Sequence, residues 1–346
     1  MPFISTSRKQ VFRRRLDHWY RTAGRHALPW RGAFDPYGVL VSEFMLQQTT
    51  VATVIPYFHR FLRSFPSVDK LARAPLEKVL ERWAGLGYYA RARNLHRTAQ
   101  ILVREHGGKV PVLRAQAESL PGVGPYTAGA LLSFAHDLPE ALVDGNVIRV
   151  LSRVFGVKGD PQRTDNRNRF WDVARALVPP DGGRHYNSAL MDFGATVCVP
   201  GLPDCPACPL SSLCWARRHG WVDRLPVPKP DSPKPVVRLI AFVVVKGDHV
   251  LLRRRPLGGL WGGLWELPTL EGPIQRTKSV AVGGGEIVPV RKKGEVRHVL
   301  SHRDVRVSLW DGRLVRPIQN SKWVRLSAVR SMAVSALTAK LADRVI

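Results

Sequence analysis

The chain has 346 residues, of which 45% are hydrophobic, and this length and composition suffice for two folded domains, each with its own core. Its 53 lysine and arginine residues against 27 aspartate and glutamate residues give a formal net charge of +26 at pH 7. The composition excludes a disordered chain. The charge favours a polyanionic partner, for which nucleic acid is the usual candidate, over a generally basic surface that has no such partner.

The N-terminal 20 residues lack the continuous apolar core of a signal peptide, and no later run approaches the roughly 20 apolar residues of a membrane span. We therefore expect a cytoplasmic protein without a membrane partner. From about residue 8 to residue 220, apolar residues recur every three or four positions, which predicts helices. Proline and glycine interrupt this pattern at residues 29–32, 65–67, 85–87 and 120–124.

The pattern changes after residue 224. Residues 225–235, LPVPKPDSPKP, hold five prolines without periodicity and predict a semi-rigid linker. Residues 236–256 predict two strands joined by a turn at Lys246-Gly247-Asp248, residues 298–310 alternate towards their end like another strand, and a helical tail closes the chain. An all-α domain, a linker and a small α+β domain follow from this pattern.

The stretch LPGVGPYTAGALL, residues 120–132, predicts a turn that leads into a helix. Its glycines and proline mark the turn, and the small residues 127–130 would allow two helices to pack closely. Backbone N–H groups at such a helix start can bind an anion.

All four cysteines lie in the loop CVPGLPDCPACPLSSLC, with the spacing C-x6-C-x2-C-x5-C. Reduced thiols in a cytosolic chain favour metal ligation over disulfides. Four thiolates suit a structural zinc ion, although zinc ribbons usually present two CxxC pairs, and they also suit a [4Fe–4S] cluster. The candidate ligands are Cys198, Cys205, Cys208 and Cys214.

Together, the turn LPGVGPYTAGA, the segment VDGNVIRVLSR (143–153) and the cysteine loop resemble the helix-hairpin-helix, iron–sulfur DNA glycosylases of the endonuclease III superfamily. LPWRG (28–32), SEFMLQQTTVATVIPYFHRF (42–61) and GLGYYARARNLH (85–96) resemble the MutY-type adenine DNA glycosylases in particular. RRPLGGLWGGLWELP (254–268) and RHVLSHRDV (297–305) resemble the second domain of that family, so the match covers nearly the whole chain.

The resemblance implies a multidomain protein. An all-α helix-hairpin-helix glycosylase domain at residues 1–224 would carry a [4Fe–4S] cluster, and a linker at 225–236 would lead to an α+β Nudix-like domain at 237–346. The implied reaction is removal of adenine mispaired with 8-oxoguanine or guanine in double-stranded DNA, by a monomeric enzyme that flips the base out of the duplex.

Glu43 and Asp144 are the carboxylates to which the resemblance assigns the chemistry. Glu43 lies in an apolar stretch, where burial would raise its pKa and keep a proton for adenine N7; the alternative is a carboxylate that caps or pairs within a helical turn. Asp144 would stabilise the cationic sugar, and it is also placed as a helix N-cap, whose N–H groups would keep it ionised. Asn146 would orient this group by hydrogen bonding.

Tyr126 occupies the position at which bifunctional relatives have a lysine that forms a Schiff base with the sugar. A phenol cannot form that imine, so we expect a monofunctional glycosylase with little or no strand cleavage. A surface tyrosine packed on the turn is the alternative, and it predicts the same absence of lyase activity.

The resemblance assigns further residues to binding. The amides of Gly122, Val123 and Gly124 would bind a DNA phosphate. Gln47, Gln48 and Tyr88 would fill the space left by the flipped base, although such residues are more often ordinary surface residues. The adenine pocket would be lined by Trp30, Arg31, Leu46 and Ser188, where Ser188 departs from the Glu or Gln usual in the family.

The C-terminal domain should read 8-oxoguanine and not hydrolyse nucleotides, because no stretch resembles the glutamate-rich Nudix catalytic motif. The reading residues would be Leu300, Ser301 and His302, with Leu300 in place of the usual aromatic. The alternative functions are a bifunctional glycosylase for oxidised pyrimidines, a non-catalytic iron–sulfur DNA-binding module, and a thymine-mismatch glycosylase.

Overall fold

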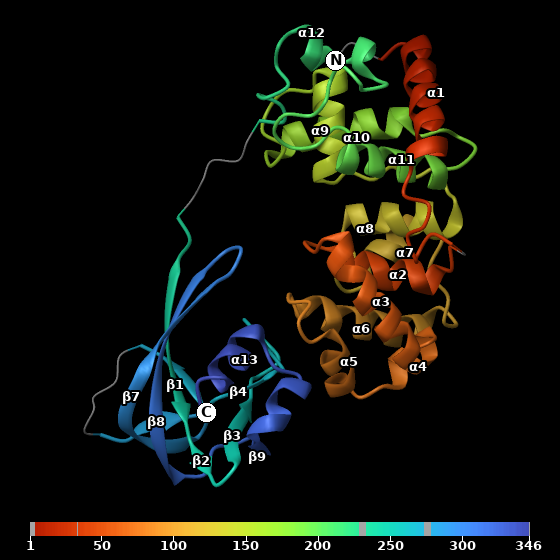
Figure 1. The fold of residues 1–346 in the computed structure, drawn as a ribbon. Coiled ribbons are helices and arrows are strands. Elements are labelled where there is room, and N and C mark those ends of the chain that lie inside the picture. Colours follow the sequence, from red (N-terminus) through yellow and green to blue (C-terminus); the bar gives the residue numbers. More distant parts are fainter. Residues whose placement is uncertain (1–3, 33, 228–232, 273–277, 346) are drawn as a thin grey trace. The chain divides into compact units, whose positions relative to one another are not determined.

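The structure, a computed structural model, describes residues 4–32, 34–227, 233–272 and 278–345 (Figure 1). The chain divides into two units. One unit comprises Met1–Phe58, Ser67–Ala72 and Arg97–Pro230, and the other comprises His59–Pro66, Arg73–His96 and Asp231–Ile346. Residues 228–232 of the predicted linker lie outside the described residues. Among the described residues, no helix is both long enough and apolar enough to cross a membrane.

Helices occupy the chain up to residue 218, as the apolar periodicity predicts. A π-helical turn, Leu131–Ala135, extends α8, and a 3₁₀ turn, Ser211–Leu213, precedes α12. The helices are α1 (Thr6–Ala23), α2 (Pro36–Leu46), α3 (Val51–Ser64), α4 (Val68–Arg73), α5 (Leu76–Trp83), α6 (Ala90–Glu105), α7 (Arg114–Glu118), α8 (Pro125–Ala130), α9 (Gly145–Phe155), α10 (Thr164–Leu177), α11 (Arg184–Thr196) and α12 (Trp215–Arg218).

Capping residues set the starts of the helices that carry the site. Asp35 caps α2, where its carboxylate accepts a hydrogen bond from the Gly38 N–H at 2.7 Å, and Pro36 occupies the first turn. Nearly all of α2 is buried, so this helix is a core element and not an amphipathic surface helix. Asp144 caps α9, and Gly156 ends it in the left-handed conformation.

Close backbone packing fixes the segment that follows the predicted turn. Thr127, Ala128, Gly129 and Ala130 are all buried, as their small size predicts. A Cβ atom added to Gly129 would lie 2.2 Å from the Ala141 carbonyl oxygen, so only glycine fits there. This contact holds α8 against the strand-like segment that leads to Asp144.

The C-terminal part of the chain forms two sheets, in agreement with the predicted α+β class. One sheet has the order β5-β1-β8-β7-β6, with β1 and β8 parallel, and the other has the order β2-β3-β4 with β9 paired to β3. The strands are β1 (Val236–Val243), β2 (Val245–Lys246), β3 (His249–Arg254), β4 (Trp265–Glu266), β5 (Thr269–Glu271), β6 (Val280–Val282), β7 (Gly285–Val299), β8 (Asp304–Arg316) and β9 (Ser321–Arg325).

The predicted turn at residues 246–248 is confirmed, since it joins β2 to β3, which pair antiparallel. Two details of this part differ from the prediction. The long strand before the turn, β1, ends at Val243 and pairs with β8 and β5, not across the turn. The expected helical tail is a 3₁₀ segment, Leu326–Ser331, followed by the helix α13, Ala336–Ala342. Ser335 caps α13 by accepting a hydrogen bond from the Thr338 N–H, which starts a new helix and interrupts the tail.

Candidate active site

One open cavity of about 960 Å³ in the helical unit gathers residues from α2, the start of α3, α8, α9 and α11. Its size lies at the upper end of ordinary small-molecule sites, which span roughly 300–1,000 Å³. Residues predicted for catalysis, for the adenine pocket and for the DNA contact line it together: Trp30, Arg31, Glu43, Leu46, Gln47, Gln48, Tyr126, Asp144, Asn146 and Ser188.

Glu43 is a buried carboxyl group at this cavity, with only 4% of the residue exposed. Burial raises its pKa to about 7, the neighbouring Asp144 adds to the rise, and a hydrogen bond with Tyr126 and the charge of Arg31 oppose it. Its Oε2 atom has no hydrogen-bond partner. A carboxyl group of this kind is protonated in a large fraction of molecules near neutral pH, which suits it to donate a proton.

Asp144 is the N-cap of α9, as predicted: its Oδ1 accepts a hydrogen bond from the Val147 N–H at 2.7 Å, and its Oδ2 accepts one from Asn146 Nδ2 at 3.0 Å. Both hydrogen bonds lower its pKa, which is the effect predicted for a helix N-terminus. Burial raises the pKa of Asp144 above its ordinary value in spite of these donors, because removal from water outweighs the helix terminus.

Tyr126 is not a surface residue packed on the turn. Its phenol donates a hydrogen bond to Glu43, and burial, followed by the charges of Glu43 and Asp144, raises its pKa well above the ordinary value. The hydroxyl therefore stays protonated and acts as a fixed donor to one oxygen of Glu43.

Arg31 is held by a residue that sequence reasoning missed. Asp192 on α11 is fully buried and forms ion pairs with Arg31 at 2.7 Å and with Arg25 at 2.6 Å. Burial alone would raise the pKa of Asp192, but hydrogen bonds and charge from the two guanidinium groups hold it below the ordinary value. The pair fixes the direction of the Arg31 side chain at the cavity. The available signal in the sequence was a lone aspartate between the apolar residues Met191 and Phe193.

Arg149 is a second residue that sequence reasoning missed. Its guanidinium donates to Asn146 Oδ1 at 2.7 Å and to the carbonyl oxygens of Gly194 and Cys198, both at 2.6 Å. One side chain therefore spans the distance from the cavity to the first residue of the cysteine loop. The sequence signal was its place one helical turn after Asn146.

Only part of the predicted phosphate-binding turn is exposed and able to contact a phosphate. Gly122 and Gly124 are exposed, but Val123 is buried and its N–H donates to the Leu120 carbonyl, so that amide is already used. Gln47 Nε2 donates to the Gly122 carbonyl at 3.3 Å, which ties Gln47 to the turn.

Gln48 and Tyr88 both have positive backbone φ angles, 59° and 47°. Residues other than glycine, asparagine and aspartate rarely adopt this left-handed backbone conformation, which costs about 1–3 kcal/mol where the surroundings impose it. Within its own unit, Tyr88 is partly exposed, and its hydroxyl lies 2.5 Å from Ser301 Oγ.

Leu300, Ser301 and His302 lie in the turn between β7 and β8. The Leu300 N–H donates to the Arg303 carbonyl at 2.8 Å, which closes the turn, and Ser301 and His302 are exposed. At the base of the turn, the largely buried Asp304 pairs with Arg297 across the two strands at 3.0 Å. The turn therefore presents two polar side chains on a firmly paired hairpin.

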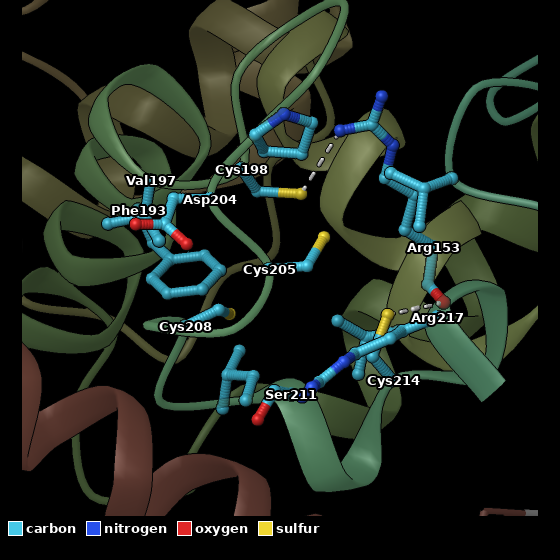
Figure 2. Close-up of a pocket in the computed structure, with 14 residues that line it drawn as sticks. Arg153, Phe193, Val197, Cys198, Asp204, Cys205, Cys208, Ser211, Cys214 and Arg217 are labelled. Carbon is cyan, nitrogen blue, oxygen red and sulfur yellow. Dashed lines mark hydrogen bonds between the residues drawn. The ribbon is translucent and has the colours of Figure 1, made fainter.

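Cys198, Cys205, Cys208 and Cys214 line one cavity beside the end of α9 (Figure 2). Arg153 Nη1 lies 3.6 Å from Cys198 Sγ, and Cys214 Sγ lies 3.3 Å from the Arg153 carbonyl oxygen. In the described part of the chain, no three cysteine, histidine, aspartate or glutamate side chains are placed to hold a single metal ion. Thiols spread around a common cavity fit a multi-iron cage, in which each thiolate binds its own iron.

Comparison with known proteins gives two family matches. The HhH-GPD superfamily base excision DNA repair protein model matches residues 41–176, and a NUDIX domain model matches residues 240–344. Among solved structures, a thermostable thymine-DNA glycosylase shares 32% identity with a TM-score of 0.57 and covers 62% of this chain and 98% of its own. A non-covalent endonuclease III–DNA complex shares 26% identity with a TM-score of 0.51 and covers 61% and 97%.

A curated relative extends over both parts of the chain. The adenine DNA glycosylase of Rattus norvegicus is 35% identical over 398 aligned residues, which cover 96% of this chain and 77% of the relative. The chain is a DNA glycosylase enzyme of base-excision repair, with a helical helix-hairpin-helix domain and a Nudix-like domain. It belongs to the family of the adenine DNA glycosylases.

Proposed function

We propose that this chain is a monofunctional glycosylase that hydrolyses the N-glycosidic bond of adenine opposite 8-oxoguanine or guanine in duplex DNA. The observation that carries the proposal is the buried Glu43, with a pKa of about 7, in the same cavity as Asp144. Two carboxyl groups in different environments supply an acid and a charge stabiliser to one bond, as in glycoside hydrolysis.

The adenine is flipped into the cavity because its glycosidic bond is out of reach inside the stack. Trp30 offers a ring face for stacking, while Arg31, fixed by Asp192, offers N–H donors to the base. Leu46 closes the apolar side. Ser188 offers a hydroxyl in place of a longer polar side chain.

Glu43 donates its proton to adenine N7, and the C1′–N9 bond then breaks with its electron pair leaving on the base. Tyr126 keeps Glu43 in position by donating to one of its oxygens. The positive charge that develops on the sugar is stabilised by the carboxylate of Asp144, which Asn146 and the Val147 N–H hold in place. Water then adds at C1′.

Strand cleavage is not part of this reaction. A lyase needs an amine that forms an imine with C1′, and the phenol of Tyr126 has none to offer. The product is an intact strand with an abasic site.

We assign further DNA contacts to residues of both units. The exposed turn at Gly122 and Gly124 binds a phosphate, and Gln47 and Gln48 at the cavity fill the gap left by the adenine. In the other unit, Tyr88 contacts the duplex and residues 300–302 contact 8-oxoguanine. Residues 1–224 carry the chemistry and residues 237–346 the reading of the opposite base. The net charge of +26 supports a polyanionic substrate for both.

The four cysteines hold a [4Fe–4S] cluster in this proposal. When bound, the cluster supplies iron–thiolate bonds that fix the loop 198–214 against α9. Arg149 donates hydrogen bonds both to the Cys198 carbonyl and to Asn146. A loop fixed in this way therefore also fixes the position of Asn146 at the cavity. Iron and sulfide analysis of the purified protein tests the assignment, and four-thiolate zinc would refute it.

Single-turnover cleavage tests the function. Duplexes with adenine opposite 8-oxoguanine, guanine or cytosine are treated with excess protein and then with hot alkali, which cuts abasic sites. We expect cutting opposite 8-oxoguanine and guanine, no cutting without alkali, and no product trapped by borohydride. Asp144→Asn should bind the duplex and not cut it. An uncut 8-oxoguanine:adenine duplex would overturn the proposal, and a borohydride-trapped product would overturn its monofunctional part.

A further inference from the structure

Two buried oxygens in the cavity have no hydrogen-bond partner. They are Ser188 Oγ, on a residue that is 1% exposed, and Glu43 Oε2. Both residues line the cavity described above. Polar atoms buried in this way are costly unless a ligand or water satisfies them, so their place in a substrate cavity points to contacts completed by the substrate.

The charged groups around these two oxygens each have hydrogen-bond or ion-pair partners within the protein. Arg31 and Arg25 pair with Asp192, and Tyr126 donates to Glu43. Asp144 accepts from two N–H groups, and Arg149 donates to Asn146 and to backbone carbonyls. The hydroxyl of Ser188 is therefore a polar group of the cavity wall that keeps its full capacity for a base.

A serine hydroxyl differs from a carboxylate in one respect that matters for a purine. It can donate one hydrogen bond and accept two, whereas an ionised carboxylate only accepts. At the 6-position, adenine carries an amino group that donates, and hypoxanthine carries a carbonyl oxygen that accepts. A hydroxyl serves either group by rotating, but a carboxylate would repel the carbonyl.

We propose that Ser188 faces the 6-position of the flipped purine and that the enzyme therefore excises 6-oxopurines, with hypoxanthine as the test case, in addition to adenine. This inference rests on the proposed adenine glycosylase function and extends its substrate class. Hypoxanthine is the hydrolytic deamination product of adenine, so the second substrate is itself a DNA lesion.

The reaction is the same hydrolysis for both bases. The C1′–N9 bond breaks with its electron pair leaving on the purine, which takes the Glu43 proton at N7. Water adds its oxygen to C1′ and gives up one proton to a carboxylate of the site. Free hypoxanthine and an abasic strand are the products, and no oxidant or reductant is consumed.

The test uses full-length protein with its cofactor and two duplexes that differ only in the target base, adenine or hypoxanthine, each opposite 8-oxoguanine. Single-turnover rates are measured with alkali cleavage. For the wild type we expect hypoxanthine excision within about tenfold of adenine excision, the effect of one neutral hydrogen bond. Ser188→Glu should lower the ratio of hypoxanthine to adenine excision by about a hundredfold, because the carbonyl oxygen of hypoxanthine, which needs a hydrogen-bond donor, would face a carboxylate that only accepts.

Ser188→Ala gives a second readout that does not depend on burying a larger side chain. It should lower hypoxanthine excision about tenfold, since the donor to the carbonyl is gone. Ser42→Ala is the matched control: that serine is also buried at the cavity, but its hydroxyl donates to the Val39 carbonyl at 2.8 Å, and its loss should affect both bases equally.

The outcomes separate the two proposals. Adenine excision with hypoxanthine left at the level of Asp144→Asn would overturn this inference and leave the adenine glycosylase function standing. No excision of either base would overturn both. Hypoxanthine excision that Ser188→Ala and Ser188→Glu leave unchanged would overturn the role of Ser188.

Discussion

Replacing Glu43 with glutamine should stabilise the protein while it abolishes catalysis. The pKa of Glu43 is raised from 4.5 to about 7, so the folded state binds this proton more tightly than the unfolded state does. At about 1.36 kcal/mol per pKa unit, ionising the buried carboxyl costs the folded state about 3 kcal/mol once the pH is well above 7. A neutral amide of the same size avoids that cost.

The sign of the pH dependence follows from the same shift. The stabilising contribution of the protonated carboxyl is complete below pH 4.5 and is lost as the pH rises through about 7. The gain from Glu43→Gln should therefore be about 3 kcal/mol at pH 8 and under about 1 kcal/mol at pH 5.

Thermal unfolding followed by helical circular dichroism at both pH values measures the effect. For a domain of this size, about 3 kcal/mol corresponds to a rise of roughly 6–12 °C in Tm. Glu105→Gln is the control, because that carboxylate is half exposed and, among the residues that the structure describes, forms its ion pair with the neighbouring Arg104. An equal gain at pH 5 and pH 8 would show that packing and not ionisation is responsible, and no gain at pH 8 would refute the buried-acid interpretation.

Three further predictions concern neighbours of Glu43 and the packing beneath the cavity. Tyr126→Phe removes a hydrogen bond that lowers the pKa of Glu43, so the alkaline fall of the single-turnover rate should move to higher pH; an unmoved profile would contradict that contact. Asp192→Asn weakens the hold on Arg31, and we expect weaker binding of substrate and a loss of about 3–5 kcal/mol in stability, measured by titration and denaturation. Gly129→Ala should cost more than about 2 kcal/mol, because its Cβ would overlap the Ala141 carbonyl oxygen, whereas Gly145→Ala meets nothing within 4 Å and should change unfolding little.

Sequence patterns predicted the features that depend on residues close together in the chain, such as burial, helix capping and close packing. The apolar surroundings of Glu43 predicted its burial, and the position of Asp144 before a helical run predicted an N-cap. The small residues from Thr127 to Ala130 predicted close packing. The change in residue pattern after residue 224 predicted the change from helices to strands. Each of these patterns is contained within a few residues.

Features that depend on contacts between distant segments were not predicted. The pairing of Asp192 with Arg31 joins residues 161 positions apart, and the pairing of β1 with β8 crosses most of the C-terminal domain. The pKa of Asp144 is a balance between burial, which raises it, and hydrogen bonds from Val147 and Asn146, which lower it; the helix position predicted the second effect and not the first. The N–H of Val123, predicted to bind a phosphate, is instead used by the Leu120 carbonyl within the turn, a local contact that residue composition does not reveal.

The left-handed backbone at Gln48 and Tyr88 bears on how these two positions can vary. Glycine or asparagine would relieve the backbone at either place, and a β-branched residue would be the worst choice. A library selected only for folding should therefore drift towards glycine and asparagine at positions 48 and 88. A library selected for repair of mispaired DNA should retain long side chains at both positions. Comparing the two selections therefore distinguishes residues favoured by the backbone conformation from residues required for contact with the substrate.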